Sequence, residues 1–371
     1  MRRPRRHPEI QLRRAWEEGA PLPVMAGLSA LSAAYRGVLA VRARLYWWGA
    51  LRTGRLPCPV VSIGNITVGG SGKTPAVELA ALTLRELGAR PAVVSRGYGR
   101  QTRGVHVVAD RDRVLLGPRA AGDEPLLLAE RLPGIPVLVG ENRYEAGRRA
   151  VEAYGANAVV LDDGFQHRTV EKDLDILVIN GRSPWGNGRL FPRGALREPR
   201  TAIGRAHLVM ITNPATAADI QVITDMVRRH NRHAPVVSAG HRVVEARQLF
   251  DGQRAAVPTL AGRPLLAFAG LGSPQGFADT VASTGIALKG LVEFPDHHWY
   301  AQEDLAELEE RAAAVGAQGL ITTEKDSVRL RSLRPPRLPL WVLPVTLVLE
   351  SNQDAWMRAL SSVWSAAVAR G

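Results

Sequence analysis

Residues 60–75 read VVSIGNITVGGSGKTP, and they are the clearest guide to the architecture of this chain. An apolar run typical of a buried strand leads into a glycine-rich loop, which ends in Gly-Lys-Thr where a helix is expected over 75–87. Closely spaced glycines let successive backbone N–H groups point at one anion, and a helix N-terminus adds partial positive charge. The order of strand, loop and helix therefore predicts a P-loop that binds phosphate groups.

The end of this loop carries the side chains that phosphate chemistry needs. Lys73 is expected to reach the outer phosphates of a nucleotide, and the Thr74 hydroxyl to bind a magnesium ion. Thr67 stands where the standard motif has its first glycine, but Gly69 and Gly70 keep the loop flexible. The alternative is a tight turn with an exposed lysine. Only four of the 48 basic residues are lysine, so a lysine at the position where a P-loop needs one favours the P-loop. The predicted nucleotide-binding residues are Thr67, Val68, Gly69, Gly70, Ser71, Gly72, Lys73 and Thr74.

Length and composition indicate two globular domains in a reducing compartment. The chain has 371 residues, which is long for one domain, and its 46% hydrophobic and 22% charged content is ordinary for a folded protein. Cys58 is the one cysteine of the sequence, which excludes an internal disulfide and a cysteine-cluster metal site.

Much of the net charge of +13 lies near the N-terminus, where residues 1–55 hold eleven arginines and three glutamates. Residues 21–35 carry no charge, but these fifteen are fewer than the roughly 20 that a spanning helix needs. A basic amphipathic helix with tryptophan at its edge favours the membrane interface, and we assign it to residues 20–55 after a basic extension at 1–19. The alternatives are a helix packed on the core with a solvated basic face and, less favoured, a nucleic-acid contact without any recognition motif.

Apolar runs alternate with helical patterns after residue 58. Strands are expected at 60–66, 91–95, 105–109, 136–139, 157–161, 175–179 and 207–211, and helices at 75–87, 124–132, 142–154 and 217–230. A second alternation places strands at 264–269, 288–294, 319–323 and 340–349, and helices near 275–284, 301–315 and 353–368. This predicts an α/β fold with a P-loop NTPase-like α/β/α sandwich at 56–234, a β linker at 235–262 and a smaller α/β/α domain at 263–371.

Acidic residues follow these predicted strands and loops. Asp162 and Asp163 come directly after the strand at 157–161, where an acidic residue beside a P-loop holds magnesium, although a capping aspartate in a loop is the alternative. Asp123 precedes the helix at 124–132 and is either the cap of that helix or a general base for a hydroxyl. The residues alone favour the cap.

The set of motifs resembles the tetraacyldisaccharide 4′-kinases of lipid A synthesis. The resemblance extends from about residue 20 to residue 350 in the same order throughout, and the P-loop of that family also lacks the first glycine. The matching stretches are Ser62–Asn65, Thr67–Pro75, Ser95–Gly99, Gly122–Pro125, Asp162–His167, Phe191–Pro199, Ala267–Gly272, Phe294–His297 and Thr323–Asp326.

The resemblance implies a kinase that uses ATP and Mg²⁺ to phosphorylate the 4′ hydroxyl of a tetraacyldisaccharide 1-phosphate. It also implies that the protein is located at the cytoplasmic face of the inner membrane of a Gram-negative-type bacterium. Its expected partners are the acylated lipid and the membrane surface. No nucleic-acid partner and no obligate protein partner are expected.

The resemblance also implies roles for individual residues. Asp123 matches the base and His297 the histidine beside it, with Lys73 as the third catalytic residue, so the base becomes the preferred role of Asp123. The positions near the metal are matched by Thr74, Asp162, Asp163 and Glu198, and further active-site positions by Arg96, Gln166, His167 and Arg197.

Two other functional classes stay open at this stage. Glycines within 265–276 suggest a dinucleotide-dependent oxidoreductase, but the last glycine comes one residue late for that fingerprint. The second alternative is a membrane-associated P-loop ATPase or switch protein, although Thr323–Asp326 lacks the spacing of a guanine-binding motif. Zinc at Asp296-His297-His298 is disfavoured, because adjacent histidines diverge on a regular backbone.

Overall fold

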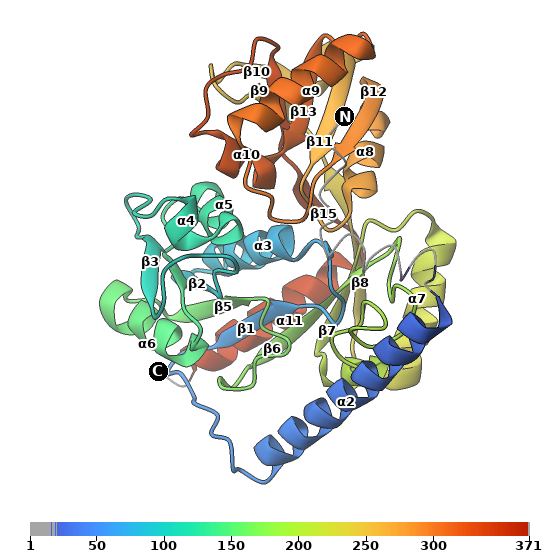
Figure 1. The fold of residues 1–371 in the computed structure, drawn as a ribbon. Coiled ribbons are helices and arrows are strands. Elements are labelled where there is room, and N and C mark those ends of the chain that lie inside the picture. Colours follow the sequence, from blue (N-terminus) through green and yellow to red (C-terminus); the bar gives the residue numbers. More distant parts are fainter. Residues whose placement is uncertain (1–15, 17–18, 20, 370–371) are drawn as a thin grey trace.

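The structure is a computed structural model that describes residues 16, 19 and 21–369 of the chain. The predicted basic extension at 1–19 therefore lies outside the described residues, apart from Trp16 and Gly19. The chain forms two α/β units, one above the other in Figure 1, and a long helix, α2 (Leu22–Trp47), beside the larger unit.

The larger unit is built on a sheet with nine strands in the described part of the chain, in the order β15-β8-β7-β6-β1-β5-β2-β4-β3. Neighbouring strands pair in parallel, except that β3 is antiparallel to β4 and β15 to β8. The strands are β1 (Val60–Gly64), β2 (Pro91–Ser95), β3 (His106–Ala109), β4 (Val137–Val139), β5 (Ala158–Asp162), β6 (Leu174–Asn180), β7 (Leu208–Thr212), β8 (Val236–Arg242) and β15 (Thr346–Ser351). Every residue of β1 is buried, as expected for a parallel strand with helices on both faces.

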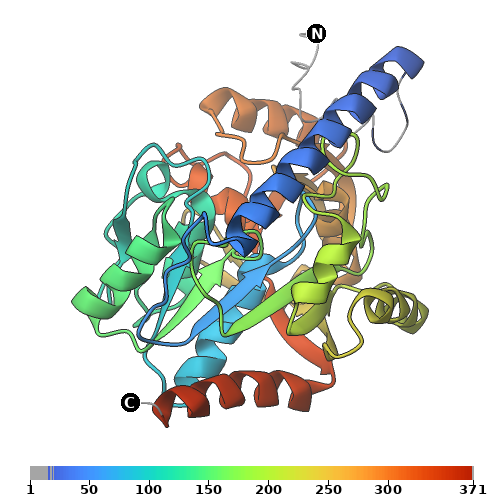
Figure 2. The same ribbon diagram turned by 90° about the horizontal axis from the view of Figure 1, so that it is seen from below.

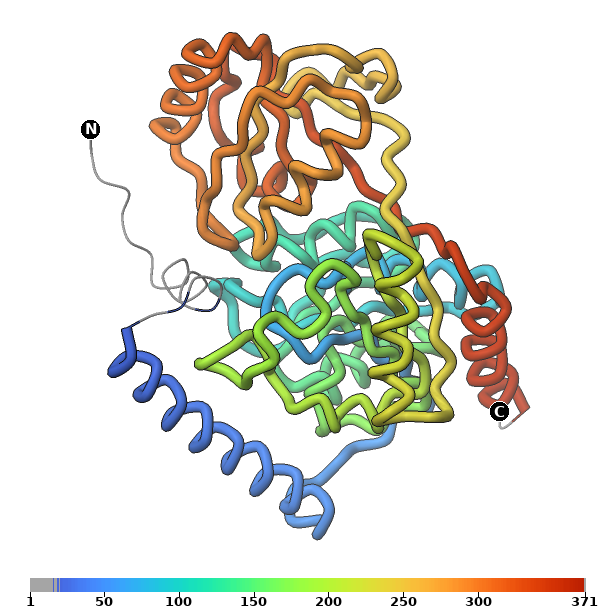
Figure 3. Tube along the Cα trace, turned by 90° about the vertical axis from the view of Figure 1, so that its right-hand side faces the viewer, coloured from blue at the N-terminus to red at the C-terminus, as the bar shows by residue number. Residues whose placement is uncertain are grey.

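Helices cover both faces of this sheet. On one face α3 (Lys73–Glu86), α5 (Asp123–Arg131) and α11 (Gln353–Val368) share one apolar cluster. On the other face lie α6 (Arg143–Tyr154) and α7 (Ala217–His230), with the 3-10 turn η1 (Arg200–Arg205) beside α7. The short helix α4 (Pro118–Ala121) precedes α5. Figures 2 and 3 show that α2 and α11 lie on opposite sides of the larger unit.

The smaller unit has six strands among the described residues, in the order β10-β9-β14-β13-β11-β12. These strands are β9 (Glu245–Gln248), β10 (Arg254–Ala256), β11 (Pro264–Ala269), β12 (Ala287–Glu293), β13 (Gly319–Thr323) and β14 (Leu340–Leu343). Helix α8 (Pro274–Ser283) packs on one face of the sheet, and α9 (Gln302–Ala314) and α10 (Glu324–Leu330) on the other. The 3-10 turn η2 (Val257–Leu260) follows β10.

The borders between the units differ from the predicted ones. The predicted linker at 235–262 is divided, because β8 pairs with β7 in the larger sheet while β9 and β10 belong to the smaller one. The predicted strand at 340–349 is two strands in different sheets, with Pro344, which has no N–H to donate to a ladder, between them. Residues 346–368 return to the larger unit, although the sequence placed them in the smaller domain. Helix α10 was not predicted.

Helix α2 has 26 residues and none of them is buried. The uncharged stretch in the sequence predicted a helix too short to span a membrane. The helix is longer than that stretch, because it continues through Arg36, Arg42 and Arg44. By length and composition it is long and apolar enough to cross a membrane. Two hydrogen bonds join it to the larger unit: Ser32 Oγ donates to Leu190 O at 3.0 Å and the Tyr35 hydroxyl to Arg197 O at 2.9 Å. The Tyr35 ring also packs on an apolar cluster of that unit, with its centroid 6.1 Å from that of Phe191.

The return of the chain to the larger unit can be tested at Trp356. This side chain is 1% exposed, and its indole N–H donates to Thr83 Oγ1 at 3.1 Å. Trp356→Ala should lower the free energy of unfolding by about 3–5 kcal/mol, because it leaves a cavity between α11 and α3. Met357→Ala on the same helix, at a position 40% exposed, should cost about 0.5 kcal/mol or less. Denaturant unfolding measures both, and equal small losses would contradict the docking of α11.

Candidate active site

The P-loop lies at the carboxyl end of β1, between Gly64 and the start of α3 at Lys73. Gly72 has a φ of 78° and Gly69 a φ of 110°, backbone conformations that favour glycine. The loop is braced from inside, because Asn65 Nδ2 donates to Ser71 Oγ at 2.9 Å and Thr212 Oγ1 to Ser71 O at 2.8 Å. The predicted strand–loop–helix is therefore present and held in a fixed shape.

A second segment holds the outer side of the loop. Val68 N donates to Ala195 O at 2.7 Å, and Thr67 forms a bridge with Leu196. The side chain of Gln166 donates to Asn65 O at 2.7 Å, so this predicted active-site residue supports the P-loop backbone.

Two aspartates meet the P-loop at the end of β5, the strand next to β1. Asp163 has a φ of 51°, and its carboxylate lies 3.7 Å from Lys73 Nζ and accepts a hydrogen bond from Arg197 Nη1 at 2.7 Å. Burial alone would raise the pKa of Asp163, but the charges of Lys73 and Arg197 lower it to about 2. The predicted positions Lys73, Asp163 and Arg197 are therefore brought together.

Asp162 has a different environment from its neighbour. Its Oδ2 accepts a hydrogen bond from Ser95 Oγ at 2.8 Å, while burial and the charges of Glu124 and Asp163 raise its pKa to about 6. The Oδ1 atoms of both Asp162 and Asp163 are buried without a hydrogen-bond partner. Unpartnered carboxylate oxygens beside a phosphate loop fit a hard divalent cation such as Mg²⁺.

The donor set for such a cation is small. The part of the chain that the structure describes holds no group of three or more His, Cys, Asp or Glu side chains able to bind a metal. Mg²⁺ usually keeps several waters and binds one or two carboxylates together with substrate phosphates. Thr74 and the two aspartates would therefore be enough protein ligands for a magnesium ion. Glu198 forms a bidentate ion pair with Arg205 at 2.8 and 2.9 Å, and among the described residues no contact joins it to either aspartate.

Asp123 and His297 come from different units and meet above this edge of the sheet. His297 follows β12 with a φ of 59°, and its Nδ1 lies 3.0 Å and 3.1 Å from the two carboxylate oxygens of Asp123. Lys325 Nζ lies 3.3 Å from His297 Nε2. A carboxylate can only accept, so Nδ1 carries the proton that faces Asp123.

Positive groups around Asp123 keep it ionised although its side chain is buried. Burial alone would raise its pKa, but the hydrogen bond from His297 and the charges of Lys325, His297 and Arg329 lower it to about 2. Arg329 Nη1 lies 3.5 Å from Asp123 Oδ2, and this guanidinium nitrogen is buried without a hydrogen-bond partner. Asp123 is the first residue of α5 rather than its N-cap, and its Oδ1 also accepts from Glu124 N at 3.0 Å.

The remaining predicted residues occupy the rim of the site. His167 Nε2 lies 2.5 Å from Thr169 Oγ1, and burial together with the cationic groups of Arg143 and Arg42 lowers the pKa of His167 to about 3. Arg96 is exposed and forms no ion pair with any residue that the structure describes. The residues predicted as one site therefore fall into a P-loop and aspartate group, an Asp123–His297 group and this rim.

Several functional side chains were not assigned a role from the sequence. Lys325 and Arg329 both lie on α10, and Arg143 is buried at the start of α6, facing the charges of Asp162 and Asp163. Lys325 had one available signal, since it is one of only four lysines in the chain.

The smaller unit is docked directly on the P-loop. A Cβ atom added to Gly272 would lie 2.9 Å from Gly69 Cα and 3.1 Å from Gly70 N. Farther from the loop, Arg131 binds Glu78 of α3 at 2.6 Å and also Glu324 of α10, which joins the two units. The P-loop and the Asp123–His297 pair thus both lie where the two units meet.

Comparison with known proteins agrees with this geometry. The family model described as tetraacyldisaccharide-1-P 4′-kinase matches residues 24–364. A tetraacyldisaccharide 4′-kinase of Syntrophus aciditrophicus is 40% identical over 355 residues, covering 92% of this chain and 95% of that protein. One from Anaeromyxobacter sp. strain K is 42% identical over 361 residues, covering 92% and 94%.

A solved structure leads to the same family. The crystal structure of LpxK from Aquifex aeolicus in complex with ATP superposes with a TM-score of 0.72 at 29% identity, covering 92% of this chain and 99% of that one. The family match spans far more than half of the chain. This chain belongs to the tetraacyldisaccharide-1-P 4′-kinase family.

Proposed function

We propose that this chain transfers the γ-phosphoryl group of ATP to the 4′ hydroxyl of a tetraacyldisaccharide 1-phosphate, giving the 1,4′-bisphosphate. Its family, and relatives of that name about 40% identical over most of the chain, support a kinase of lipid A biosynthesis. The observation that carries the proposal is that the Asp123–His297 pair and the P-loop both lie where the two units meet, which we take as the active-site cleft.

The P-loop side of the cleft binds and orients the nucleotide. Lys73 and the loop N–H groups neutralise charge on the outer phosphates, which is what phosphoryl transfer needs most from a protein. Thr74, Asp162 and Asp163 would hold Mg²⁺, which supplies charge neutralisation between the β- and γ-phosphates when bound. Glu198 stays a predicted metal ligand, although its carboxylate is engaged by Arg205.

The opposite side of the cleft positions the acceptor. The 4′ oxygen forms a bond to the γ-phosphorus, the bond from that phosphorus to the bridging oxygen of ADP breaks, and the hydroxyl proton goes to Asp123. A carboxylate with a pKa of about 2 is a weak base, so it orients the hydroxyl first and takes the proton as the new bond forms. His297 donates to the carboxylate through Nδ1 and fixes its direction.

The substrate is a membrane lipid, and α2 offers a surface for the membrane. Leu31, Val38, Val41 and Trp47 on this helix are 57–83% exposed, as expected for a helix that contacts the acyl-chain boundary. We infer attachment at the inner membrane, on the cytoplasmic side where ATP is available.

The rival functions are less well supported. The glycine turn at 270–272 that suggested a dinucleotide site packs against the P-loop, so it does not face an open crevice. A P-loop switch or ATPase would give no phosphorylated lipid product, and a lipid-phosphorylation assay separates it from the kinase.

Removing the phosphate clamp should abolish most of the turnover. With labelled ATP, Mg²⁺ and the acylated disaccharide 1-phosphate, the wild-type chain should yield a doubly phosphorylated lipid, and Lys73→Ala should lower the rate by roughly 10²-fold or more. Lys289→Ala, at an exposed lysine of β12, is the matched control and should keep its activity. Near-normal turnover of a folded Lys73→Ala variant would sink the kinase proposal.

Asp123→Asn separates a base from a residue with a merely structural role. The amide is a far weaker base, so kcat should fall by roughly 10²-fold or more. The variant also loses a buried carboxylate whose pKa is lowered to about 2, so the free energy of unfolding should fall by about 2–3 kcal/mol, and kcat is compared on folded protein. Combined with His297→Ala, the loss should be smaller than the product of the two single losses, because residues that act together are not additive. Asp112→Asn on the surface is the control. Wild-type turnover of Asp123→Asn would place the base elsewhere.

The low pKa of Asp123 sets the pH dependence. A carboxyl pKa lowered to about 2 stabilises the folded chain above the unfolded value of about 4, and this contribution is lost as the pH falls through about 2. His297→Ala removes a hydrogen bond that lowers this pKa, so the acid limb of kcat/KM should move to higher pH. Profiles from about pH 3 to pH 8 test this, because the wild-type limb lies near pH 2, and His233→Ala is the control. Superimposable wild-type and His297→Ala profiles would contradict it.

A further inference from the structure

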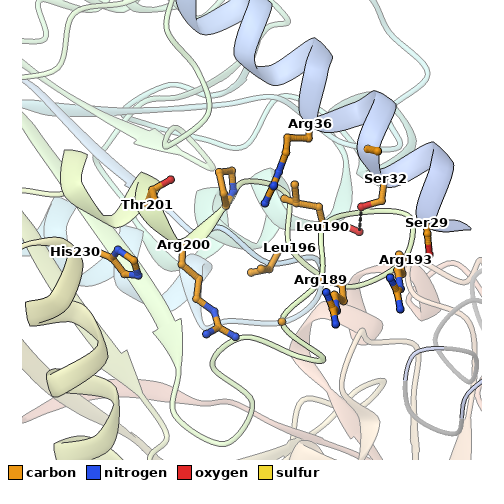
Figure 4. Close-up of a pocket in the computed structure, with 13 residues that line it drawn as sticks. Ser29, Ser32, Arg36, Arg189, Leu190, Arg193, Leu196, Arg200, Thr201 and His230 are labelled. Carbon is orange, nitrogen blue, oxygen red and sulfur yellow. Dashed lines mark hydrogen bonds between the residues drawn. The ribbon is translucent and has the colours of Figure 1, made fainter.

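A cavity of about 580 Å³ lies between α2 and the segment 188–201 of the larger unit (Figure 4). Four arginines line it, and we call it the arginine cavity: Arg36 from α2, and Arg189, Arg193 and Arg200 from the segment. Figure 4 shows Arg36 reaching from the helix toward this segment, with Ser32 hydrogen-bonded to Leu190 beside it. Among residues 16, 19 and 21–369, no acidic residue lines the arginine cavity.

The charge of the arginine cavity is uncompensated among the residues that the structure describes. None of its four arginines forms an ion pair there, whereas Arg197 and Arg205 nearby bind Asp163 and Glu198. The Nε atoms of Arg193 and Arg200 are buried without a hydrogen-bond partner. Several guanidinium groups lining one concave site are suited to a phosphate, which they bind with charge-assisted hydrogen bonds.

The helix presents two opposite faces. Ser29, Ser32, Ala33 and Arg36 follow the spacing of one helical face and line the arginine cavity. The exposed apolar residues Val24, Leu31 and Val38, each seven residues apart, lie on the other side of the helix. A helix that turns this apolar side toward the acyl chains holds the arginine cavity at the level of the lipid headgroups.

We propose that the arginine cavity binds the phosphate of an anionic phospholipid headgroup from the surrounding bilayer. The shared chemistry is a lipid-borne phosphate, and the substrate also carries one. We commit to the bilayer lipid because the cavity is lined by none of the P-loop residues, nor by Asp162, Asp163, Asp123 or His297. The same segment also carries Arg197, so a bound headgroup would steady the partner of Asp163.

Vesicle binding by the full-length chain, without nucleotide or substrate, tests the site. The probes are phosphatidylcholine vesicles with and without phosphatidylglycerol. The double variant Arg193→Gln/Arg200→Gln should lose roughly tenfold or more in affinity for the anionic vesicles while its binding to neutral vesicles through α2 is unchanged. Arg228→Gln/Arg229→Gln, which removes the same charge from exposed positions of α7, should lose much less. Equal losses in the two double variants would overturn the proposal, since general electrostatics would then explain the binding.

A second arm separates the two sources of phosphate. In neutral micelles that hold the acylated disaccharide 1-phosphate, the KM of the cavity variant should equal that of the wild type. A raised KM there, with unchanged binding to anionic vesicles, would assign the cavity to the substrate and overturn the proposal.

Thermal unfolding checks the fold, and the single variants Arg36→Gln and Arg189→Gln carry the same test if the double variant does not fold. The vesicle arm needs no turnover, so it can fail while the kinase activity holds.

Discussion

The hydrogen bond between His297 and Asp123 is the contact on which the site depends, because its two partners belong to different units. Neither unit alone contains both the acceptor-orienting pair and the phosphate loop. Away from the loop, the docking that brings them together combines the ion pairs of Arg131 with Glu78 and Glu324 and the burial of Val328 of α10 in the apolar cluster of the larger unit. At the loop itself it is steric, since the approach of Gly272 to the P-loop leaves no room for a side chain. Opening of the cleft would therefore remove the partner of the carboxylate and uncover the phosphate site in one movement.

Different surroundings in the site give two neighbouring carboxyl groups different pKa values. Asp162 and Asp163 are adjacent in sequence, yet one pKa is raised to about 6 and the other lowered to about 2. Burial acts on both, but only Asp163 has Lys73 and Arg197 beside it. Asp123 resembles Asp163, since cationic groups outweigh burial there too. Neighbouring carboxyl groups with pKa values shifted in opposite directions are typical of functional sites, because specific neighbours fix the charge state of each.

Much of the larger unit was predictable because its signals are local. The P-loop and the acidic end of β5 follow from strand, loop and helix order, and parallel strands bring their carboxyl ends to one edge. The return of β15 was not predictable, because 340–349 reads as one apolar run and only pairing with β8 separates its halves. Helix α10, which carries Lys325, is seven residues long, too short for a clear helical period. The role of Asp123 stayed ambiguous from the sequence, because aspartate is equally suited to cap a helix and to act as a general base.

The segment 188–201 connects α2 to the P-loop site. On one side it accepts hydrogen bonds from Ser32 and Tyr35 of α2. On the other side Ala195 accepts from the P-loop, and the Arg197 side chain binds Asp163. Backbone atoms of Arg197 therefore bind the helix while its guanidinium binds the acidic edge of β5. A displacement of α2 would then move the guanidinium that keeps Asp163 ionised, so this one residue links the helix to the P-loop site.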